Sequence, residues 1–233
     1  MAATVAAILS ENFMVSRIYN RSVHIREIEL CGDTMWSGKT AWPSRSDLIR
    51  STDDILHCYN RGVDKQQIFF GHEFYGLFLS LVESFHLREE LKILAYCLMP
   101  NHFHFLFRQL RAFAISTFME KVCGEYAKTV NQVRQRVGHL FQRRYGVKWV
   151  WRDSDVPLLV NYLHQNPVKG GLVKLPQEWD YSSCREYMKI RPPGFLDLDA
   201  VLTEMNEKHD YHSYPEGNCD AESQLPTRSR FRE

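Results

Sequence analysis

The sequence predicts an α+β domain in which helices pack on an antiparallel sheet. Two observations carry this prediction: a composition that allows one core of ordinary size, and the order of the periodic segments. Of the 233 residues, 44% are hydrophobic and 24% are charged, which excludes wholesale disorder and allows a single domain with tails. The segments follow in the order strand, helix, strand, strand, helix, strand, helix. This order is typical of an antiparallel sheet with its helices on one side.

Each element has its own signal. Apolar residues recur at helical spacing over residues 73–86, which indicates an amphipathic helix. Met99, Pro100 and Asn101 supply turn chemistry between two apolar runs, and this predicts a strand–turn–strand unit. The expected strands are residues 55–60, 91–98, 102–107 and 145–151, and the expected helices are residues 73–86, 112–137 and 155–165.

The last helix has the clearest boundaries. Asp155 is a suitable N-cap, and Pro157 falls in the first turn. We expect the helix to stop near Asn166, because Pro167 disfavours helical geometry in the residue before it. The predicted organisation is a poorly defined N-terminal extension over residues 1–52, one domain over residues 53–193, and an acidic, partly disordered tail over residues 194–233.

Charge is nearly balanced overall but unevenly distributed. The formal net charge is +1, yet residues 108–152 hold ten basic and two acidic side chains, a net charge of +8, and residues 196–223 have a net charge of −7. Tyr145, Trp149 and Trp151 lie among the basic residues, and we expect them to stack on unpaired bases. This mixture favours binding of unpaired nucleic acid over a merely solvated helix face. The basic side chains expected to contact DNA here are Arg134, Arg136, Arg143, Arg144, Lys148 and Arg152.

Composition also bears on the compartment. No apolar run approaches the ~18 residues that a membrane span needs. The apolar stretch within residues 1–14 has no basic region before it, so we expect no signal peptide. The six cysteines are scattered without a Cys-x-x-Cys pair, which favours reduced thiols in a cytoplasmic protein over a disulfide frame or a zinc ribbon.

The stretch over residues 99–107 carries the candidate chemistry. In a strand, residues two apart point to the same face, so His102 and His104 project together while Phe103, Phe105 and Phe107 point to the core. Two imidazoles on a rigid strand supply two of the ligands that a metal site needs. Spacing alone leaves metal binding and ordinary hydrogen bonding to a carbonyl about equally open.

Five ordered blocks resemble one known family. The blocks are residues 58–65 (Cys-Tyr-Asn-Arg-Gly-Val-Asp-Lys), 94–104 (Leu-Ala-Tyr-Cys-Leu-Met-Pro-Asn-His-Phe-His), 138–142 (Gly-His-Leu-Phe-Gln), 161–173 (Asn-Tyr-Leu-His-Gln-Asn-Pro-Val-Lys-Gly-Gly-Leu-Val) and 179–183 (Trp-Asp-Tyr-Ser-Ser). Together they resemble the single-tyrosine transposases of the HUH superfamily, and more closely their REP-associated (RAYT) branch. The resemblance covers about residues 55–190 and is far more specific than any single block.

This resemblance implies a ferredoxin-like domain that cleaves and rejoins single-stranded DNA near hairpins through a 5′-phosphotyrosine. In the family, two strand histidines and one amide bind a divalent ion, and a helical tyrosine attacks the phosphate. Carried over, the ligands of Mg²⁺ or Mn²⁺ are His102, His104 and Asn166, and the nucleophile is Tyr162. Many relatives outside this branch have Gln at the amide position, so the shorter Asn166 has to approach the ion more closely.

The helical period agrees with this assignment and leaves two alternatives. Tyr162 and Asn166 are four apart and share a helix face, whereas His164 points elsewhere on the period. Gln165 is the alternate ligand, and Tyr126, on the long helix, is the rival nucleophile. Further phosphate contacts are expected from Arg61 and Lys65, beside the first strand.

Three functions follow as hypotheses. The first is a metal-dependent DNA transesterase, which the presence of all four site residues favours. The second is a transposase descendant that holds hairpin DNA without cutting it. The third is an unrelated metallohydrolase using His102 and His104, which no further Asp, Glu or His motif supports. We expect single-stranded or hairpin DNA as the partner, no membrane contact, a monomer or homodimer, and a place in the bacterial cytoplasm, on the nucleoid when bound to DNA.

Overall fold

A four-stranded antiparallel sheet forms the centre of the molecule. The computed structural model describes residues 45–86, 88–150, 155–199 and 201. The strand order is β2-β3-β1-β4 and every neighbouring pair is antiparallel, which is the ferredoxin-like arrangement, so the predicted fold class is confirmed. The strands are β1 (Ile55–Arg61), β2 (Leu91–Met99), β3 (His102–Gln109) and β4 (Gly146–Trp149).

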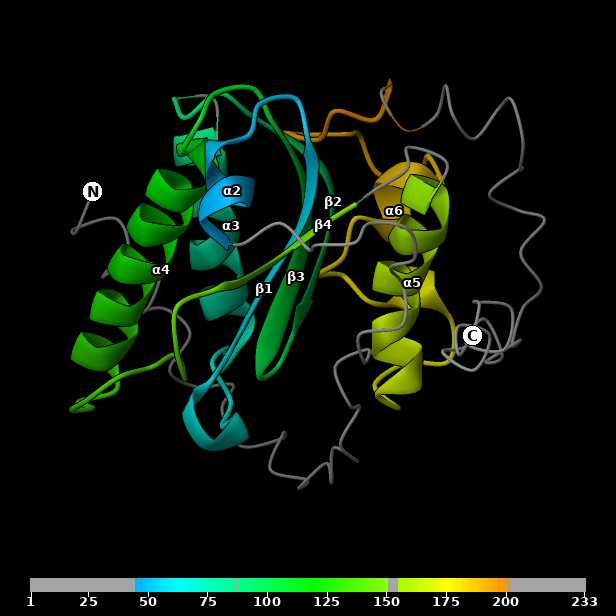
Figure 1. The fold of residues 1–233 in the computed structure, drawn as a ribbon. Coiled ribbons are helices and arrows are strands. Elements are labelled where there is room, and N and C mark those ends of the chain that lie inside the picture. The colour runs from blue at the N-terminus through cyan, green and yellow to red at the C-terminus, as the bar shows by residue number, and fades with distance from the viewer. Residues whose placement is uncertain (1–44, 87, 151–154, 200, 202–233) are drawn as a thin grey trace, which may run out of the picture.

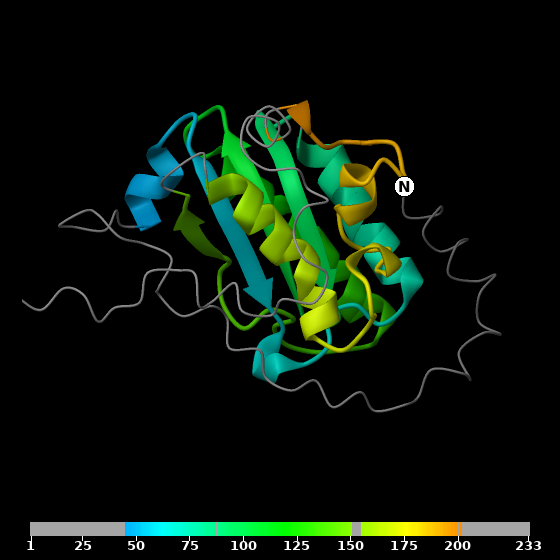
Figure 2. The same ribbon diagram turned by 90° about the vertical axis from the view of Figure 1, so that its right-hand side faces the viewer.

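Helices cover both faces of this sheet. Figures 1 and 2 show α3 and α4 against one face and α5 across the other, so the expectation of helices on one side is wrong. The reason lies in β2, where eight of the nine positions are buried. A strand that is covered on both faces has a nearly continuous apolar sequence, as β2 has. The helices are α2 (Arg45–Arg50), α3 (His72–His86), α4 (Ala114–Val133), α5 (Val156–Lys169) and α6 (Cys184–Tyr187), with 3₁₀ turns η2 (Val63–Lys65) and η4 (Pro176–Glu178).

The alternation predicted for β3 is confirmed. Its phenylalanines pack against α3 and α4, with ring centroids 5.0 Å apart for Phe103 and Phe78 and 5.3 Å apart for Phe107 and Phe118. On the opposite face, Leu106 belongs to the apolar cluster that α5 completes. The two faces therefore have separate cores, and the histidines of β3 lie on the face that α5 covers.

Helix α4 is shorter than predicted, because it ends at Val133 rather than near Gly138. Gln135 has a φ of 50°, so the chain leaves the helix in the left-handed region. The Arg136 amide donates to the Asn131 carbonyl (2.9 Å), which closes the helix as a Schellman motif does. A glycine usually occupies this position. Because Gln135 stands there instead, the sequence gives no local signal for the end of the helix.

Helix α5 is longer than predicted and runs through Pro167 to Lys169. Proline has no N–H, so the Leu163 carbonyl lacks its usual partner in the helix. The Asn166 side chain supplies one, since its Nδ2 donates to the carbonyls of Leu163 (3.2 Å) and Tyr162 (3.0 Å). The substitution of a side-chain amide for the missing backbone donor lets the helix continue.

Segments that composition assigns to the extension and the tail contribute to the folded part. Leu48 of α2 is buried in the main core. Beyond the predicted end of the domain, the Asp197 amide donates to the Ile93 carbonyl of β2 (2.9 Å), and the Asp197 carboxylate lies 2.7 Å from Lys92. Residues 1–44 and 202–233 lie outside the described part of the chain.

Two general features concern the described residues as a whole. No helix among them has the length and apolar character that crossing a membrane requires. None of their four cysteines forms a disulfide, and Cys58, Cys97 and Cys184 are buried. Burial raises the pKa of the Cys97 thiol, which keeps it protonated and unreactive.

Candidate active site

His102 and His104 lie side by side on the sheet face beneath α5. Their ring centroids are 5.1 Å apart and their planes are nearly perpendicular, at 89°. Both are buried, with 5% and 1% of the residue exposed. The register of β1 and β3 pairs His102 with Arg61 and His104 with Tyr59. The sheet therefore presents two buried imidazoles next to a cationic side chain.

Each imidazole uses its Nδ1 atom within the protein. His102 Nδ1 is 2.6 Å from Asn101 Oδ1, and His104 Nδ1 is 3.0 Å from His57 Nε2. The Nε2 atom of His104 is buried and has no hydrogen-bond partner in the described part of the chain. Buried polar atoms are nearly always satisfied in folded proteins, so this nitrogen is suited to bind an ion or an ordered water molecule.

Burial keeps these imidazoles neutral. It lowers the pKa of His104 to about 3, with the charges of Arg61 and Lys148 adding to the effect. The pKa of His102 is held well below its ordinary value by burial, then by His104 and Arg61. Burial, and then the charges of His104 and Lys148, also hold the pKa of His57 well below its ordinary value. Neutral imidazole is the form that binds a metal ion.

The residues present fit a divalent cation with open coordination positions. Within residues 45–86, 88–150, 155–199 and 201, no group of three or more His, Cys, Asp or Glu side chains is placed to hold a metal ion. A third protein ligand would therefore be a neutral oxygen. Asn166 is buried on α5, and because its Nδ2 donates to helix carbonyls, Oδ1 is the amide atom that remains to accept or ligate.

The two candidate tyrosines lie in very different surroundings. Tyr162 is half-buried on α5, packs against the apolar cluster of the histidine face, and has the Lys169 ammonium 5.1 Å from its ring centroid. Tyr126 is fully buried under the opposite face, and its hydroxyl donates to the Ile68 carbonyl (2.8 Å). Burial also raises the pKa of Tyr126. A phenol sealed in this way cannot reach DNA, so Tyr126 is unsuitable as the nucleophile, and the role of Tyr162 stays a prediction.

His164 and Gln165 are the neighbours of Tyr162 on α5 for which the sequence made predictions. His164 is buried and its Nε2 lies 2.8 Å from Ser183 Oγ, so it faces away from the histidine pair. Gln165, the alternate ligand, is half-buried. Its part in metal binding stays a prediction.

Basic side chains gather at the end of the sheet where the β2–β3 turn and His102 lie. The Gln142 amide donates to the Arg61 carbonyl (2.9 Å), which fastens the segment after α4 to the end of β1. Arg143 and Arg144 follow directly and are exposed. The structure thereby brings together basic residues that are about eighty positions apart in the sequence.

The other predicted DNA contacts flank this end. Arg134, at the end of α4, is exposed and lies 4.8 Å from the centroid of the Phe70 ring. Arg136 is half-buried, and Lys65 is exposed in η2. Lys148 lies on β4 opposite His57, on the histidine face.

The predicted stacking surface is only partly available. Tyr145 is buried within the main core, so the expectation that it stacks on bases is wrong. Tyr145 directly precedes β4, and its side chain belongs to the apolar core that α3 and α4 cover. Trp149 is half-buried on β4. Trp151 and Arg152 lie outside the described residues.

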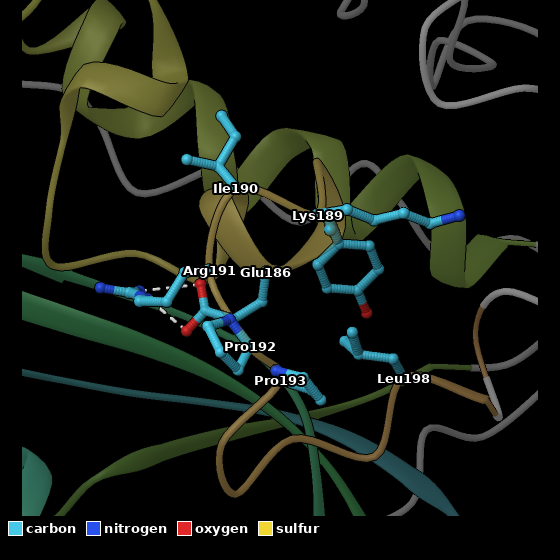
Figure 3. A pocket seen from close by; sticks show the side chains of 8 residues that line it. Glu186, Lys189, Ile190, Arg191, Pro192, Pro193 and Leu198 are labelled. Carbon is cyan, nitrogen blue, oxygen red and sulfur yellow. Dashed lines mark hydrogen bonds and ion pairs between the residues drawn. The ribbon is translucent and has the colours of Figure 1, made fainter.

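A cavity of about 360 Å³ lies between α6 and the segment that follows it (Figure 3). The carboxylate of Glu186 points toward Arg191, whose Nη2 lies 2.8 and 2.7 Å from its two oxygens. This pairing neutralises the acid, and the Tyr187 hydroxyl of the same lining donates to the Leu94 carbonyl (2.8 Å). These groups serve the fold, and we assign the cavity no catalytic role.

Two residues that contact the histidine pair are missing from the sequence-based site. Asn101 is assigned there only to the turn, although it directly precedes His102. His57 is 47 positions from His104, and the β1–β3 register brings them together. Its signal in the sequence is weak: His57 alternates with Tyr59 and Arg61 along one strand.

Known proteins resemble part of this chain. The family model described as "Transposase IS200 like" matches residues 54–166. A protein of Haemophilus influenzae, named provisionally as a REP-associated tyrosine transposase, is 28% identical over 107 residues, which cover 41% of this chain and 60% of that protein. The chain thus matches less than two-thirds of the length of this curated relative.

Two solved structures match the chain, and the first of them resembles its fold. The structure of a REP-associated tyrosine transposase bound to a REP hairpin matches with a TM-score of 0.52 and 15% identity, covering 70% of this chain and 93% of that chain. A crystal structure from Deinococcus radiodurans, provisionally named a transposase, matches with a TM-score of 0.36 and 16% identity over 56% of this chain and 97% of that one. Residues 54–166 thus match the IS200-like transposase family, and the chain is similar to a REP-associated tyrosine transposase.

Proposed function

We propose that this protein is a metal-dependent, transposase-like transesterase that cleaves and rejoins single-stranded DNA at or near hairpins through a 5′-phosphotyrosine intermediate. The observation that carries the proposal is the pair of buried, neutral imidazoles of His102 and His104, with the orphaned Nε2 of His104. This pair lies on the face covered by α5, the helix that bears Tyr162. The match of residues 54–166 to the IS200-like family model supports the same chemistry.

His102 and His104, with Asn166 as the third ligand, would hold Mg²⁺ or Mn²⁺. When bound, such an ion polarises a non-bridging oxygen of the scissile phosphate. Imidazole donors also suit Zn²⁺ or Ni²⁺, so metal preference in the test tube is expected to be broader than Mg²⁺ and Mn²⁺.

Tyr162 supplies the nucleophile. Its phenol oxygen forms a bond to phosphorus while the bond from phosphorus to the 3′ oxygen breaks. The phenol proton ends on that oxygen, so the products are a 5′-phosphotyrosine and a strand with a free 3′-hydroxyl. The covalent link keeps the energy of the phosphodiester, which a 3′-hydroxyl uses when it attacks in the reverse direction to rejoin the strands.

Arg61 and Lys148 supply positive charge on the histidine face. Arg61 is paired with His102 across the strands, and its Nε is buried without a hydrogen-bond partner among the described residues. A guanidinium with an unused donor in a desolvated position suits a phosphate oxygen. We therefore propose that Arg61 contacts the backbone of DNA close to the reacting phosphate.

The proposed partner is single-stranded or hairpin DNA. Arg143 and Arg144 are exposed and follow Gln142, whose amide bonds to the Arg61 carbonyl, and they support a surface that follows the phosphate backbone. One relative of the same fold is bound to a REP hairpin, which suggests the kind of DNA to test. Location on the nucleoid in the bacterial cytoplasm, and a monomeric or homodimeric state, belong to the proposal.

A cleavage assay with substrates labelled at one end or the other tests the proposal. Hairpin oligonucleotides are taken from the genomic DNA that flanks the gene and are labelled at either the 3′ or the 5′ end. They are then incubated with the full chain and Mn²⁺. We expect the 3′ label in a covalent protein–DNA species on a denaturing gel and the 5′ label in a shorter free strand. A shift on a native gel without any covalent species would support the non-cleaving binding protein instead.

A further inference from the structure

We propose that Asn101 and His57 are positioning residues that hold His102 and His104 in one tautomer, with the proton on Nδ1 and the lone pair of Nε2 presented to a divalent cation. This inference rests on the proposed function for the identity of the ligand. The tautomer assignment is independent of the proposed function, because it follows from the hydrogen bonds of the two rings.

The tautomer of His102 follows from a chain of two hydrogen bonds. Asn101 Nδ2 donates to the carbonyl of Lys65 (3.1 Å), which fixes the orientation of the amide. Asn101 Oδ1 then faces His102 Nδ1 at 2.6 Å. An amide oxygen can only accept, so Nδ1 of His102 carries the proton and its Nε2 holds the lone pair.

The contact between His57 and His104 is a hydrogen bond in the plane of the two rings. The centroids are 5.2 Å apart, the planes differ by 20°, and His57 Nε2 is 3.0 Å from His104 Nδ1. Two nearly coplanar five-membered rings give both distances when they meet end to end. One nitrogen therefore donates and the other accepts.

The surroundings of His104 decide which nitrogen donates. If Nδ1 accepted, the proton would lie on Nε2, which is buried and has no acceptor among the described residues. A buried N–H without an acceptor costs about 1–3 kcal/mol. If Nδ1 donates to His57, Nε2 becomes a lone pair, and orphaned acceptors are tolerated better than orphaned donors. The geometry therefore favours the Nδ1–H form, which is the form that ligates through Nε2.

This arrangement gives each expected ligand its own support. Asn101 holds His102 from the turn before β3, and His57 holds His104 from the neighbouring strand β1. Such outer partners set the ring orientation and raise the basicity of the ligand, and their loss typically costs 10–100-fold in metal affinity.

Nitrogen spectroscopy and calorimetry test this inference on the full chain. Two-bond ¹H–¹⁵N correlation spectra of the metal-free protein with ¹⁵N-labelled histidine report the tautomer of each ring. We expect the Nδ1–H form for His102 and His104. For His57→Phe, which removes the acceptor, we expect Mn²⁺ binding about 10–100-fold weaker, and for His57→Gln, which restores an acceptor, a value near that of wild type.

His86→Phe is the matched control. His86 is buried to a similar degree as His57, but it lies on α3 and its Nδ1 contacts the Glu83 carbonyl (2.9 Å). We expect its replacement to leave Mn²⁺ affinity unchanged. If His57→Phe does not fold, Asn101→Ala tests the second support in the same way through His102.

Different results overturn the inference and the proposed function. A proton on Nε2 of His104 in the metal-free protein overturns the inference, as does His57→Phe with the Mn²⁺ affinity of wild type. Wild-type protein that shows both Nδ1–H tautomers but binds no Mn²⁺ supports the tautomer assignment and contradicts the metal site of the proposed function.

Discussion

The chemical character of His102 and His104 is set by what surrounds each nitrogen. Both Nδ1 atoms have partners within the protein, and the buried Nε2 of His104 has none among the described residues. Burial and the nearby charges of Arg61 and Lys148 also hold the pKa of His104 far below neutral pH. The pair is thus neutral and oriented, and the proposed metal site requires both properties.

Removal of the pair tests its role at the scale of residues. We expect His102→Ala with His104→Ala to abolish Mn²⁺ binding and DNA cleavage while circular dichroism shows the same fold, because the main core lies on the other face of β3. Calorimetry with Mn²⁺ measures the binding. The exposed His139 offers a control, His139→Ala, that leaves binding intact. Undiminished Mn²⁺ binding by the double variant would place the ion elsewhere.

Helix α5 shows how one element carries both a structural device and the proposed chemistry. The Asn166 amide replaces the backbone donor that Pro167 lacks, and this lets the helix extend to Lys169. The same bond directs the amide nitrogen into the helix, so ligation by Asn166 uses the oxygen. The proposed ligand and nucleophile are therefore held in register by the helix itself.

A double-mutant cycle at this site tests the structural part. We expect Asn166→Ala to lower the free energy of unfolding by about 1–3 kcal/mol, because the Leu163 carbonyl loses its buried donor. Adding Pro167→Ala restores a backbone N–H at residue 167, so the double variant should recover part of this loss. Urea unfolding measures both. A double variant that loses as much free energy of unfolding as Asn166→Ala alone, or more, would contradict the role of Asn166. Asn161→Ala on the same helix is the control.

The elements were predictable from sequence where their signals are local. Strand alternation in β3 and the helical period over residues 73–86 depend on neighbours in the chain, and both predictions are confirmed. The ends of α4 and α5 were mispredicted, because Gln135 adopts a conformation that usually takes glycine and Asn166 compensates for Pro167. His57 joins the site through strand register, which no local pattern reveals.

At the scale of the whole molecule, basic side chains and the histidine pair lie toward the same end. Backbone contacts join Phe141 and Gln142 to the end of β1, so the chain carries Arg143 and Arg144 past this end of the sheet. Figure 1 shows η2 and the C-terminal ends of α4 and α5 at this end of the molecule. A nearly neutral protein thereby presents a concentrated positive surface near the proposed reaction centre.

Salt dependence tests this surface. We expect Arg143→Gln with Arg144→Gln to weaken binding to all single-stranded and hairpin sequences about equally. Each lost phosphate contact should reduce the slope of log K against log salt by about 0.7. Fluorescence anisotropy at several salt concentrations measures the slope. Arg88→Gln, exposed at the opposite end of the sheet before β2, is the control. An unchanged slope in the double variant would remove these arginines from the interface.

Acid sensitivity is a second property of the whole molecule. Burial lowers the pKa of His164 to about 3, whereas an unfolded histidine has a pKa of about 6.5. Between these values the unfolded chain takes up a proton that the native state does not. Stability is therefore highest above about pH 6.5 and falls as the pH decreases, by up to about 1.4 kcal/mol per pH unit for each such histidine.

Urea unfolding of the metal-free protein at pH 7.5, 6.5 and 5.5 measures this effect. His164→Gln removes one titrating group and keeps a side chain able to hydrogen-bond Ser183, so its stability should fall less steeply with acidification. The same slope in the variant and the wild type would contradict the neutral, buried state of His164.

The central claim is that the hydroxyl of Tyr162 attacks DNA, and one measurement tests it most directly. Tyr162→Phe and Tyr126→Phe are each incubated with Mn²⁺ and the 3′-labelled hairpin oligonucleotide, and the covalent species is quantified and mapped by mass spectrometry. We predict that Tyr162→Phe binds DNA normally but forms no covalent species and no 3′-hydroxyl product, because only the attacking oxygen is gone. Tyr126→Phe should cleave as the wild type does, since that hydroxyl is committed to the Ile68 carbonyl. A covalent species formed at full rate by Tyr162→Phe, and mapped to another tyrosine, would contradict the account.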